Sequence, residues 1–298
     1  MKTRVLKYAL TASLLVWGAF PATAQDKPQV VSVNYALQYF AERLLGDEAD
    51  VTLPVPQDVD PSFWRPSIAD IGTIQSADLI ILNGAGFATW VDRVSLPRSK
   101  IVNTTAAIED QFIRTESITH SHGDGDEHSH EGLATYIWLD PSLAVGQAEA
   151  IAAALTARGV GSADQIAVEL DALRADLETL DATTQAALAG LIDVAIITTH
   201  PRYQYFAKRY GLTVSALEWE AGAAPNAAEV ADLAALMEQT GAQMLIWEAA
   251  PPAEALAMAS DLGLKNIVFP PLAQSVAGRD YLQVFEEAVA KMSEVNTQ

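Results

Sequence analysis

The chain has 298 residues, half of them hydrophobic, and carries 38 Asp and Glu against 18 Lys and Arg, for a formal net charge of −20 at pH 7. Such acidity argues against a nucleic-acid partner and favours the approach of cations. The absence of cysteine excludes disulfide bonds and thiolate metal sites, while the length is sufficient for two cores of ordinary domain size.

Residues 1–24 have the pattern of an export signal. Three basic residues precede an apolar run from Ala9 to Phe20, and Ala22-Thr23-Ala24 forms a small-x-small cleavage site. The apolar run is shorter than the ~20 residues that span a bilayer. We therefore expect cleavage near Ala24, export to the periplasm and no direct insertion into the membrane.

In the first half of the remaining chain, short apolar runs alternate with segments of helix length. The pattern predicts a helix at Leu37–Leu45, ended by Gly46. Strands separated by helices indicate βαβ units and a parallel sheet. The predicted strands are Val30–Asn34, Val51–Val55, Ala77–Leu82 and Ile101–Asn103.

A His-rich loop is expected at residues 118–132. It contains four of the five histidines of the chain, interleaved with carboxylates, and between the first and last of them there is no apolar residue. Neutral imidazole is a good ligand for zinc, copper and nickel. We expect a mobile loop that binds metal loosely, because fixing each ligand costs ordering entropy. The candidate ligands are His120, His122, His128 and His130.

A long helix is predicted at residues 162–190, between the two halves. Ser162 is a suitable N-cap, and apolar residues recur at alternating spacings of four and three until Gly190. At 1.5 Å per residue the helix is ~40 Å long, enough to traverse two lobes and to let them hinge only slightly. The apolar stripe consists of Ile166, Leu170, Leu173, Leu177 and Leu180.

The second half repeats the pattern of the first. Residues 38–43 match residues 204–209 at an offset of 166, which places Asn34 on His200. Both residues then follow the first strand of a sheet, where open α/β sheets bind ligands. The predicted elements are the strands Val194–Thr199, Thr213–Leu217, Gln243–Trp247 and Ile267–Phe269 and a helix at Tyr205–Tyr210.

The predicted fold class is thus α/β, with two (β/α) lobes that each hold a mainly parallel sheet. Residues 25–161 form the N-terminal lobe, 162–190 the connecting helix and 191–298 the C-terminal lobe.

His200 is the candidate metal ligand between the lobes. Glu248 ends a neighbouring strand, and Glu218 and Glu220 follow another, so several carboxylates should converge on the same sheet edge. Imidazole with carboxylates is a suitable ligand set for zinc or manganese. We interpret His200, Glu220 and Glu248 as the preferred set.

Five segments together resemble the zinc and manganese substrate-binding proteins of ABC importers, over essentially the whole chain after the signal. They are Val55–Pro61, Ala77–Gly86, the His-rich loop, Trp138–Pro141 and Tyr205–Leu212. The resemblance implies two lobes joined by a rigid helix, a metal held between them by four segments, and an ABC permease of the inner membrane as partner.

The same resemblance implies four ligand positions, and this chain retains one of them. His200 matches the third. Ser62 and Tyr136 stand where the family has histidines, and Pro270-Pro271 stands where it has an aspartate.

Three interpretations remain open at this point. A displaced site could use His200 with the glutamates, completed by a histidine from the loop. Alternatively, aromatic side chains could line a cleft rebuilt for a metal chelate or a small organic solute. A third possibility is a zinc buffer or chaperone that works through the His-rich loop. The candidate aromatics are Trp64, Tyr136, Trp138, Trp219 and Trp247.

The leading hypothesis is a monomeric periplasmic protein that captures Zn²⁺ and hands it to the permease. The histidines favour zinc over manganese. We do not expect catalytic activity, because one cleft histidine and no cysteine are a poor basis for metal-assisted hydrolysis. The sequence also has no nucleophile elbow, P-loop or dinucleotide motif.

Overall fold

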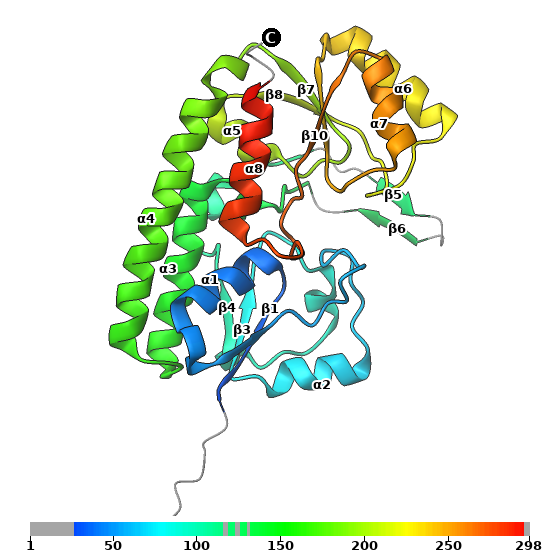
Figure 1. Cartoon of the computed structure of the whole chain (residues 1–298). Helices are drawn as coiled ribbons and strands as arrows, with labels where there is room; N and C mark the ends of the chain where they lie inside the picture. Colours follow the sequence, from blue (N-terminus) through cyan, green and yellow to red (C-terminus); the bar gives the residue numbers. More distant parts are fainter. Residues whose placement is uncertain (1–26, 116–118, 123–125, 130–131, 295–298) are drawn as a thin grey trace, which may run out of the picture.

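The computed structural model describes residues 27–115, 119–122, 126–129 and 132–294, which form two α/β lobes connected along one side by long helices (Figure 1). The predicted signal peptide and His130 lie outside the described residues. The two-lobed architecture predicted from the alternation of strands and helices is confirmed.

The sheet of the N-terminal lobe is fully parallel, with strand order β2-β1-β3-β4. Helix α1 (Tyr35–Leu45) follows β1 directly, because the Asn34 side chain accepts a hydrogen bond from the Leu37 amide and caps the helix. Helix α2 (Ile68–Ser76) begins at a Ser67 capping box. The strands are β1 (Gln29–Ser32), β2 (Asp50–Thr52), β3 (Leu79–Leu82) and β4 (Ile101–Asn103).

The sheet of the C-terminal lobe repeats this topology, with order β10-β9-β7-β8. The first strand of each lobe pairs in parallel with the second and the third. The sequence match between residues 38–43 and 204–209 thus agrees with two lobes that have the same strand order. The elements are β7 (Ala195–Thr198), α5 (Gln204–Tyr210), β8 (Thr213–Ala216), α6 (Ala227–Thr240), β9 (Met244–Trp247), α7 (Ala253–Asp261) and β10 (Lys265–Val268).

The predicted connecting helix is α4 (Ala163–Leu188), and Ser162 caps it. Ile166, Leu173, Leu177 and Leu180 are buried, as their spacing predicts. The helix does not join the lobes alone: α3 (Pro141–Arg158) lies beside it (Figure 1), and α1 and α8 (Tyr281–Ser293) also pack on it. The sequence pattern predicts α1 and α4 but not α3, because α3 is rich in alanine and has no clear apolar stripe.

One hydrophobic cluster runs through both lobes, from Val30 in β1 to Met292 in α8. Tyr281 joins the lobes: its ring stacks on Tyr39 with centroids 5.6 Å apart, and its hydroxyl donates to the Trp138 carbonyl at 2.5 Å. The Tyr35 amide donates to the carbonyl of Ala273 at 2.8 Å. These contacts hold the segment after β10 against the N-terminal lobe.

The His-rich segment was expected to lack regular structure, and this expectation was wrong for the part that is described. Thr119–His122 (β5) and Asp126–Ser129 (β6) pair as antiparallel strands, with His120 opposite His128. Backbone hydrogen bonds between two strands need no apolar residue, so the composition did not exclude a hairpin.

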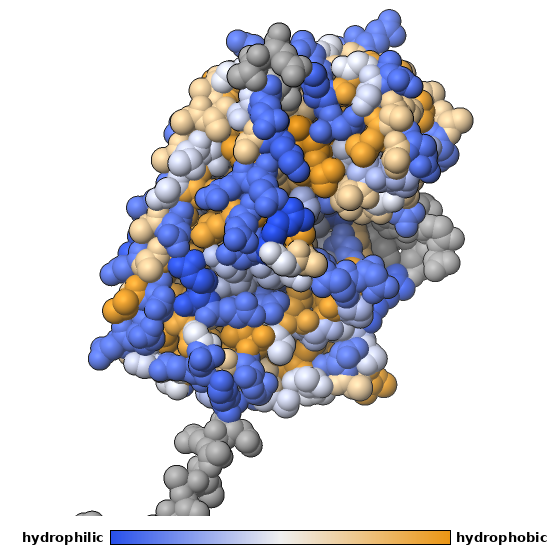
Figure 2. Space-filling view, in the orientation of Figure 1, coloured by the Kyte–Doolittle hydropathy of each residue, from blue (hydrophilic) through white to orange (hydrophobic). Residues whose placement is uncertain are grey.

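The face of the molecule shown in Figure 2 is mainly hydrophilic, with small apolar patches between the charged residues. Within the described residues, no helix is both long and apolar enough to cross a bilayer.

Candidate functional site

The loop after β7 places the candidate site where the two lobes meet. Backbone hydrogen bonds fix this loop: the Thr199 amide donates to the Ile246 carbonyl at 2.9 Å, and the Trp219 amide donates to the Thr199 carbonyl at 2.8 Å. The Thr198 hydroxyl donates to the carbonyl of His200 at 2.9 Å. The side chains that follow therefore have a rigid base.

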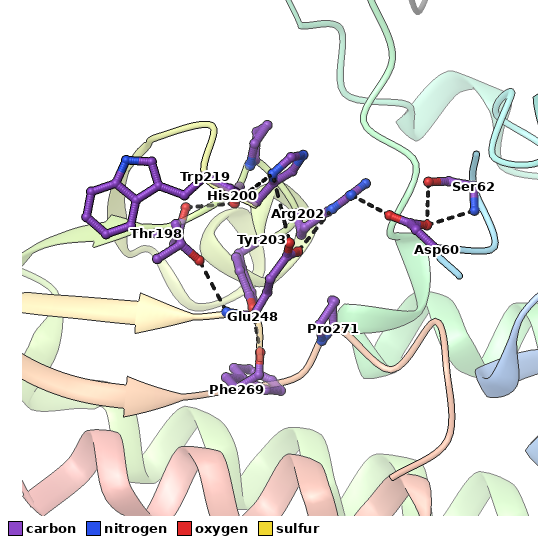
Figure 3. A network of polar contacts seen from close by, with 12 residues as sticks. Asp60, Ser62, Thr198, His200, Arg202, Tyr203, Trp219, Glu248, Phe269 and Pro271 are labelled. Atoms are coloured by element: carbon purple, nitrogen blue, oxygen red, sulfur yellow. Dashed lines mark hydrogen bonds and ion pairs between the residues drawn. The ribbon is translucent and has the colours of Figure 1, made fainter. Parts of the chain in front are cut away.

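Arg202 is the central residue of this site, and its guanidinium bridges the lobes (Figure 3). Its Nη2 donates to Asp60 Oδ2 of the N-terminal lobe at 2.6 Å, and its Nε donates to Glu248 Oε2 of the C-terminal lobe at 3.3 Å. The guanidinium carbon lies 4.7 Å from the centre of the Tyr136 ring and 5.7 Å from that of Phe63. Only 8% of the side chain is exposed.

The environment keeps Arg202 protonated. Burial alone would lower the pKa of its guanidinium, but the carboxylates of Asp60 and Glu248 raise that pKa above its ordinary value. The sequence interpretation missed this residue, although one signal was present: an arginine two residues after His200, at the end of an apolar strand, in a chain poor in basic residues.

Asp60 is the acidic partner from the N-terminal lobe. Its Oδ1 accepts hydrogen bonds from the Ser62 amide at 2.8 Å and the Ser62 hydroxyl at 2.6 Å. Burial would raise the pKa of Asp60, but Arg202 and Ser62 outweigh it and leave this pKa below the usual value. Gln274 anchors the preceding residue, because its amide donates to the Val59 carbonyl at 3.0 Å.

Glu248 is the acidic partner from the C-terminal lobe, at the end of β9. Burial, which Arg202 partly offsets, raises the pKa of its carboxyl. Its backbone amide donates to the Thr199 hydroxyl at 3.2 Å, and its Oε1 lies 3.9 Å from His200 Nδ1. The structure thus brings together two of the three predicted cleft ligands.

His200 is buried and held by a carbonyl. Its Nδ1 lies 3.2 Å from the carbonyl oxygen of Trp219, which can only accept. We therefore assign the proton to Nδ1, which places the lone pair on Nε2, the arrangement common in metal-binding histidines. His200 is thus suited chemically to ligate a metal.

The other positions singled out by the family resemblance carry no comparable donors. The Ser62 hydroxyl donates to Asp60. Tyr136 is almost fully buried, and this burial raises its pKa well above the usual value, so the phenol is neutral. Pro270 has no donor side chain, and the next residue, Pro271, offers its carbonyl to Trp138 Nε1 at 2.8 Å.

The third predicted ligand, Glu220, is exposed on the surface, and so is Glu218. Among the side chains that the structure describes, no three His, Cys, Asp or Glu residues gather closely enough to hold a metal ion. His200, Glu220 and Glu248 therefore do not form the predicted three-membered group. The ligand roles of His200 and Glu248 remain predictions.

The predicted cleft aromatics are dispersed. Trp219 does not line the cleft but packs against Trp247 in the core of the C-terminal lobe, with ring centroids 5.5 Å apart. Trp64 lines a pocket of about 190 Å³ in the N-terminal lobe, where it meets Trp90 edge to face. Indoles bury large apolar areas, which favours the core positions.

Of the His-rich segment, only the backbone of β5 and β6 is described, so His120, His122 and His128 are placed on the two strands of the hairpin. Figure 1 shows this hairpin on the side of the molecule away from α3 and α4. Their roles as metal ligands, like that of His130, remain predictions.

Comparison with known proteins decides the family. The sequence pattern of the family described as "Zinc-uptake complex component A periplasmic" (ZnuA) matches residues 30–295. The chain belongs to the ZnuA family. It is 28% identical to the high-affinity zinc uptake system protein ZnuA of Bacillus subtilis, over 83% of this chain and 79% of that protein.

Other relatives of the ZnuA family are longer than this chain. The zinc-binding lipoprotein AdcA of Streptococcus pneumoniae is 26% identical over the entire chain, which spans 61% of AdcA. The crystal structure of Zn(II)-bound AdcA from the same organism superposes with a TM-score of 0.76 at 22% identity, covering 91% of this chain and 58% of AdcA. This similarity confirms the two-lobed fold, and the ZnuA family is a zinc-uptake component.

Proposed function

We propose that this chain is the periplasmic solute-binding component of a zinc importer, which captures Zn²⁺ between its lobes and delivers it to an ABC permease of the inner membrane. The observation that carries this proposal is the ZnuA family match over residues 30–295. The protein binds its cargo and releases it unchanged, so we expect no turnover of generic esters or phosphates with added zinc.

The lobe interface supplies the chemistry that supports the proposal. His200 offers Nε2 of its imidazole and Glu248 a carboxylate, whose Oε1 lies 3.9 Å from Nδ1 of the same ring. Nitrogen and oxygen donors of this kind are the usual zinc ligands in a protein without cysteine. The acidic surface raises the local concentration of cations around the protein.

The His-rich segment supports a second route of zinc capture. Four histidines within eleven residues, with three carboxylates among them, form a dense run of zinc donors. In this alternative the segment holds zinc as a buffer, and the cleft is not the main binding site. A cleft rebuilt around tryptophans for an organic solute has less support, because Trp219 and Trp247 are core residues.

Zinc titration by calorimetry separates the cleft from the segment. We compare the metal-free protein, a variant in which His120, His122, His128 and His130 are alanine, and His200→Ala in both backgrounds. In the segment variant, His200→Ala should weaken zinc binding at least tenfold, about 1.4 kcal/mol, because it removes the imidazole at the lobe interface.

The outcomes are distinct. An unchanged affinity on His200→Ala would show that the cleft is not organised around this imidazole. If only the segment variant lost zinc binding, the buffer function would replace capture between the lobes. Absence of any zinc binding by the unaltered chain would overturn the proposal as a whole.

A further inference from the structure

We propose that Arg202 is a tethered cation that competes with the cargo for the carboxylates of the cleft and thereby sets the affinity of the cleft for a free divalent metal. This inference deepens the proposed function and rests on it for the nature of the cargo. Its basis is the geometry of Asp60, Arg202 and Glu248 at the junction of the lobes (Figure 3).

The first step concerns position. Arg202 contacts carboxylates from both lobes, one on each side of the junction. Two residues at positions implied as metal ligands by the family resemblance lie around it: Tyr136 faces the guanidinium at 4.7 Å, and Ser62 hydrogen-bonds to its partner Asp60. His200 approaches the same Glu248 carboxylate at 3.9 Å. The guanidinium of Arg202 therefore occupies the position that a cation bound by both lobes would take.

The second step concerns charge. A buried carboxylate such as Glu248 requires a positive partner or several donors, and Arg202 is the partner of Glu248 and of the partly buried Asp60. A divalent ion bound to those carboxylates would face a guanidinium within a few ångströms, in a setting that screens charge weakly. The metal can enter only if Arg202 turns away and loses its ion pairs, its hydrogen bonds and its contact with the Tyr136 ring.

The third step concerns side-chain chemistry. Arginine stays protonated under all ordinary conditions, and Arg202 is held between two carboxylates. The competing charge cannot be removed by a change of pH, so it is displaced only by a cation that binds more strongly. Such a residue would reject weakly binding divalent ions and admit only a metal with strong preference for nitrogen and oxygen donors.

The test uses the segment variant, with alanine at the four histidines of residues 120–130, so that zinc binding reports on the cleft. In this background we compare Arg202→Gln, which removes the charge, with Arg202→Lys, which keeps it. Arg209→Gln is the matched control, because it removes one arginine that pairs with Asp181 outside the site.

Calorimetric titration with zinc should show at least a tenfold gain in affinity for Arg202→Gln over the parent. Arg202→Lys and Arg209→Gln should bind within about twofold of the parent. Adding His200→Ala to Arg202→Gln should abolish the gain, which would locate the new binding in the cleft.

Several results would overturn the inference. Zinc binding by Arg202→Gln no tighter than that of the parent would make Arg202 a purely structural ion pair. An equal gain for Arg202→Lys would show that the charge is not the competing feature. If Arg202→Gln does not fold, Arg202→Met replaces it. If neither variant folds even with zinc present, zinc does not take the place of the Arg202 guanidinium, and the inference is refuted.

The failure of this inference and the failure of the proposed function are distinguishable. Tight zinc binding by the unaltered cleft with no gain in Arg202→Gln would leave the function intact and refute the competition. If Arg202→Gln gained zinc affinity while the unaltered chain bound no zinc, the competition would be supported and the proposed function refuted.

Discussion

Asp60 shows how a single side chain can couple the two lobes. It accepts hydrogen bonds from Ser62 in its own lobe and from Arg202 in the other. Removing one member of a buried ion pair leaves an uncompensated charge and costs about 3–5 kcal/mol in other proteins. The Asp60 side chain is 34% exposed, so solvent reduces the effect here.

Asp60→Asn should therefore lower the free energy of unfolding by about 1–3 kcal/mol at neutral pH. Because the folded-state pKa of Asp60 lies below its usual value, its contribution is fully present above the ordinary carboxyl pKa of about 3.9. It is lost as the pH falls through the folded-state pKa.

Thermal unfolding between pH 7 and pH 3 measures this dependence. The Asp60→Asn variant should lose less stability on acidification than the unaltered protein. Asp47→Asn, at an exposed carboxylate, is the control for a change in net charge. Equal acid sensitivity of Asp60→Asn and the unaltered protein would contradict the coupling.

At the scale of elements, α4 is the structural link on which the arrangement of the lobes depends. Its inner face is buried against α1, α3 and α8. Its outer face is exposed, and includes Val168 at 64% exposure. The helix is stabilised mainly by this packing rather than by its intrinsic propensity.

Leu173→Ala should reduce the free energy of unfolding by about 2–5 kcal/mol, because a fully buried leucine leaves a cavity that neighbours fill only in part. Val168→Ala in the same helix is the matched control and should change stability by less than about 0.5 kcal/mol. Urea unfolding followed by circular dichroism measures both. A similar effect of the two substitutions would mean that α4 does not pack as described.

At the scale of the whole molecule, one main hydrophobic core runs through both lobes, and a smaller cluster around Trp219 and Trp247 lies within the C-terminal lobe. The main hydrophobic cluster includes residues of β1, α4, β7 and α8. Tyr281 and the segment after β10 contact the N-terminal lobe directly. Two structural lobes therefore share much of the apolar burial that drives folding.

We accordingly predict one cooperative unfolding transition for the whole chain. Scanning calorimetry should give a calorimetric enthalpy equal to the van't Hoff enthalpy. Zinc at saturating concentration should move this single transition to higher temperature, since the site between the lobes exists only in the folded state. Two resolved transitions, with zinc shifting just one of them, would show that the lobes unfold independently.

The sequence by itself determined the repeated strand-helix pattern, the long helix with its N-cap at Ser162 and the position of His200 after β7. These features are local, because periodicity and capping act within a few residues of one another. The sequence also contained the family resemblance, which the match over residues 30–295 confirms.

Only the tertiary structure decided which side chains meet at the junction of the lobes. Asp60 and Arg202 are 142 residues apart, and Arg202 and Glu248 are 46 apart, so no local pattern could pair them. Glu220 and Trp219 are neighbours in sequence, yet one is exposed and the other is in the core. The orientation of a side chain in a loop depends on the packing of both lobes, and that packing placed an arginine between a carboxylate of each lobe.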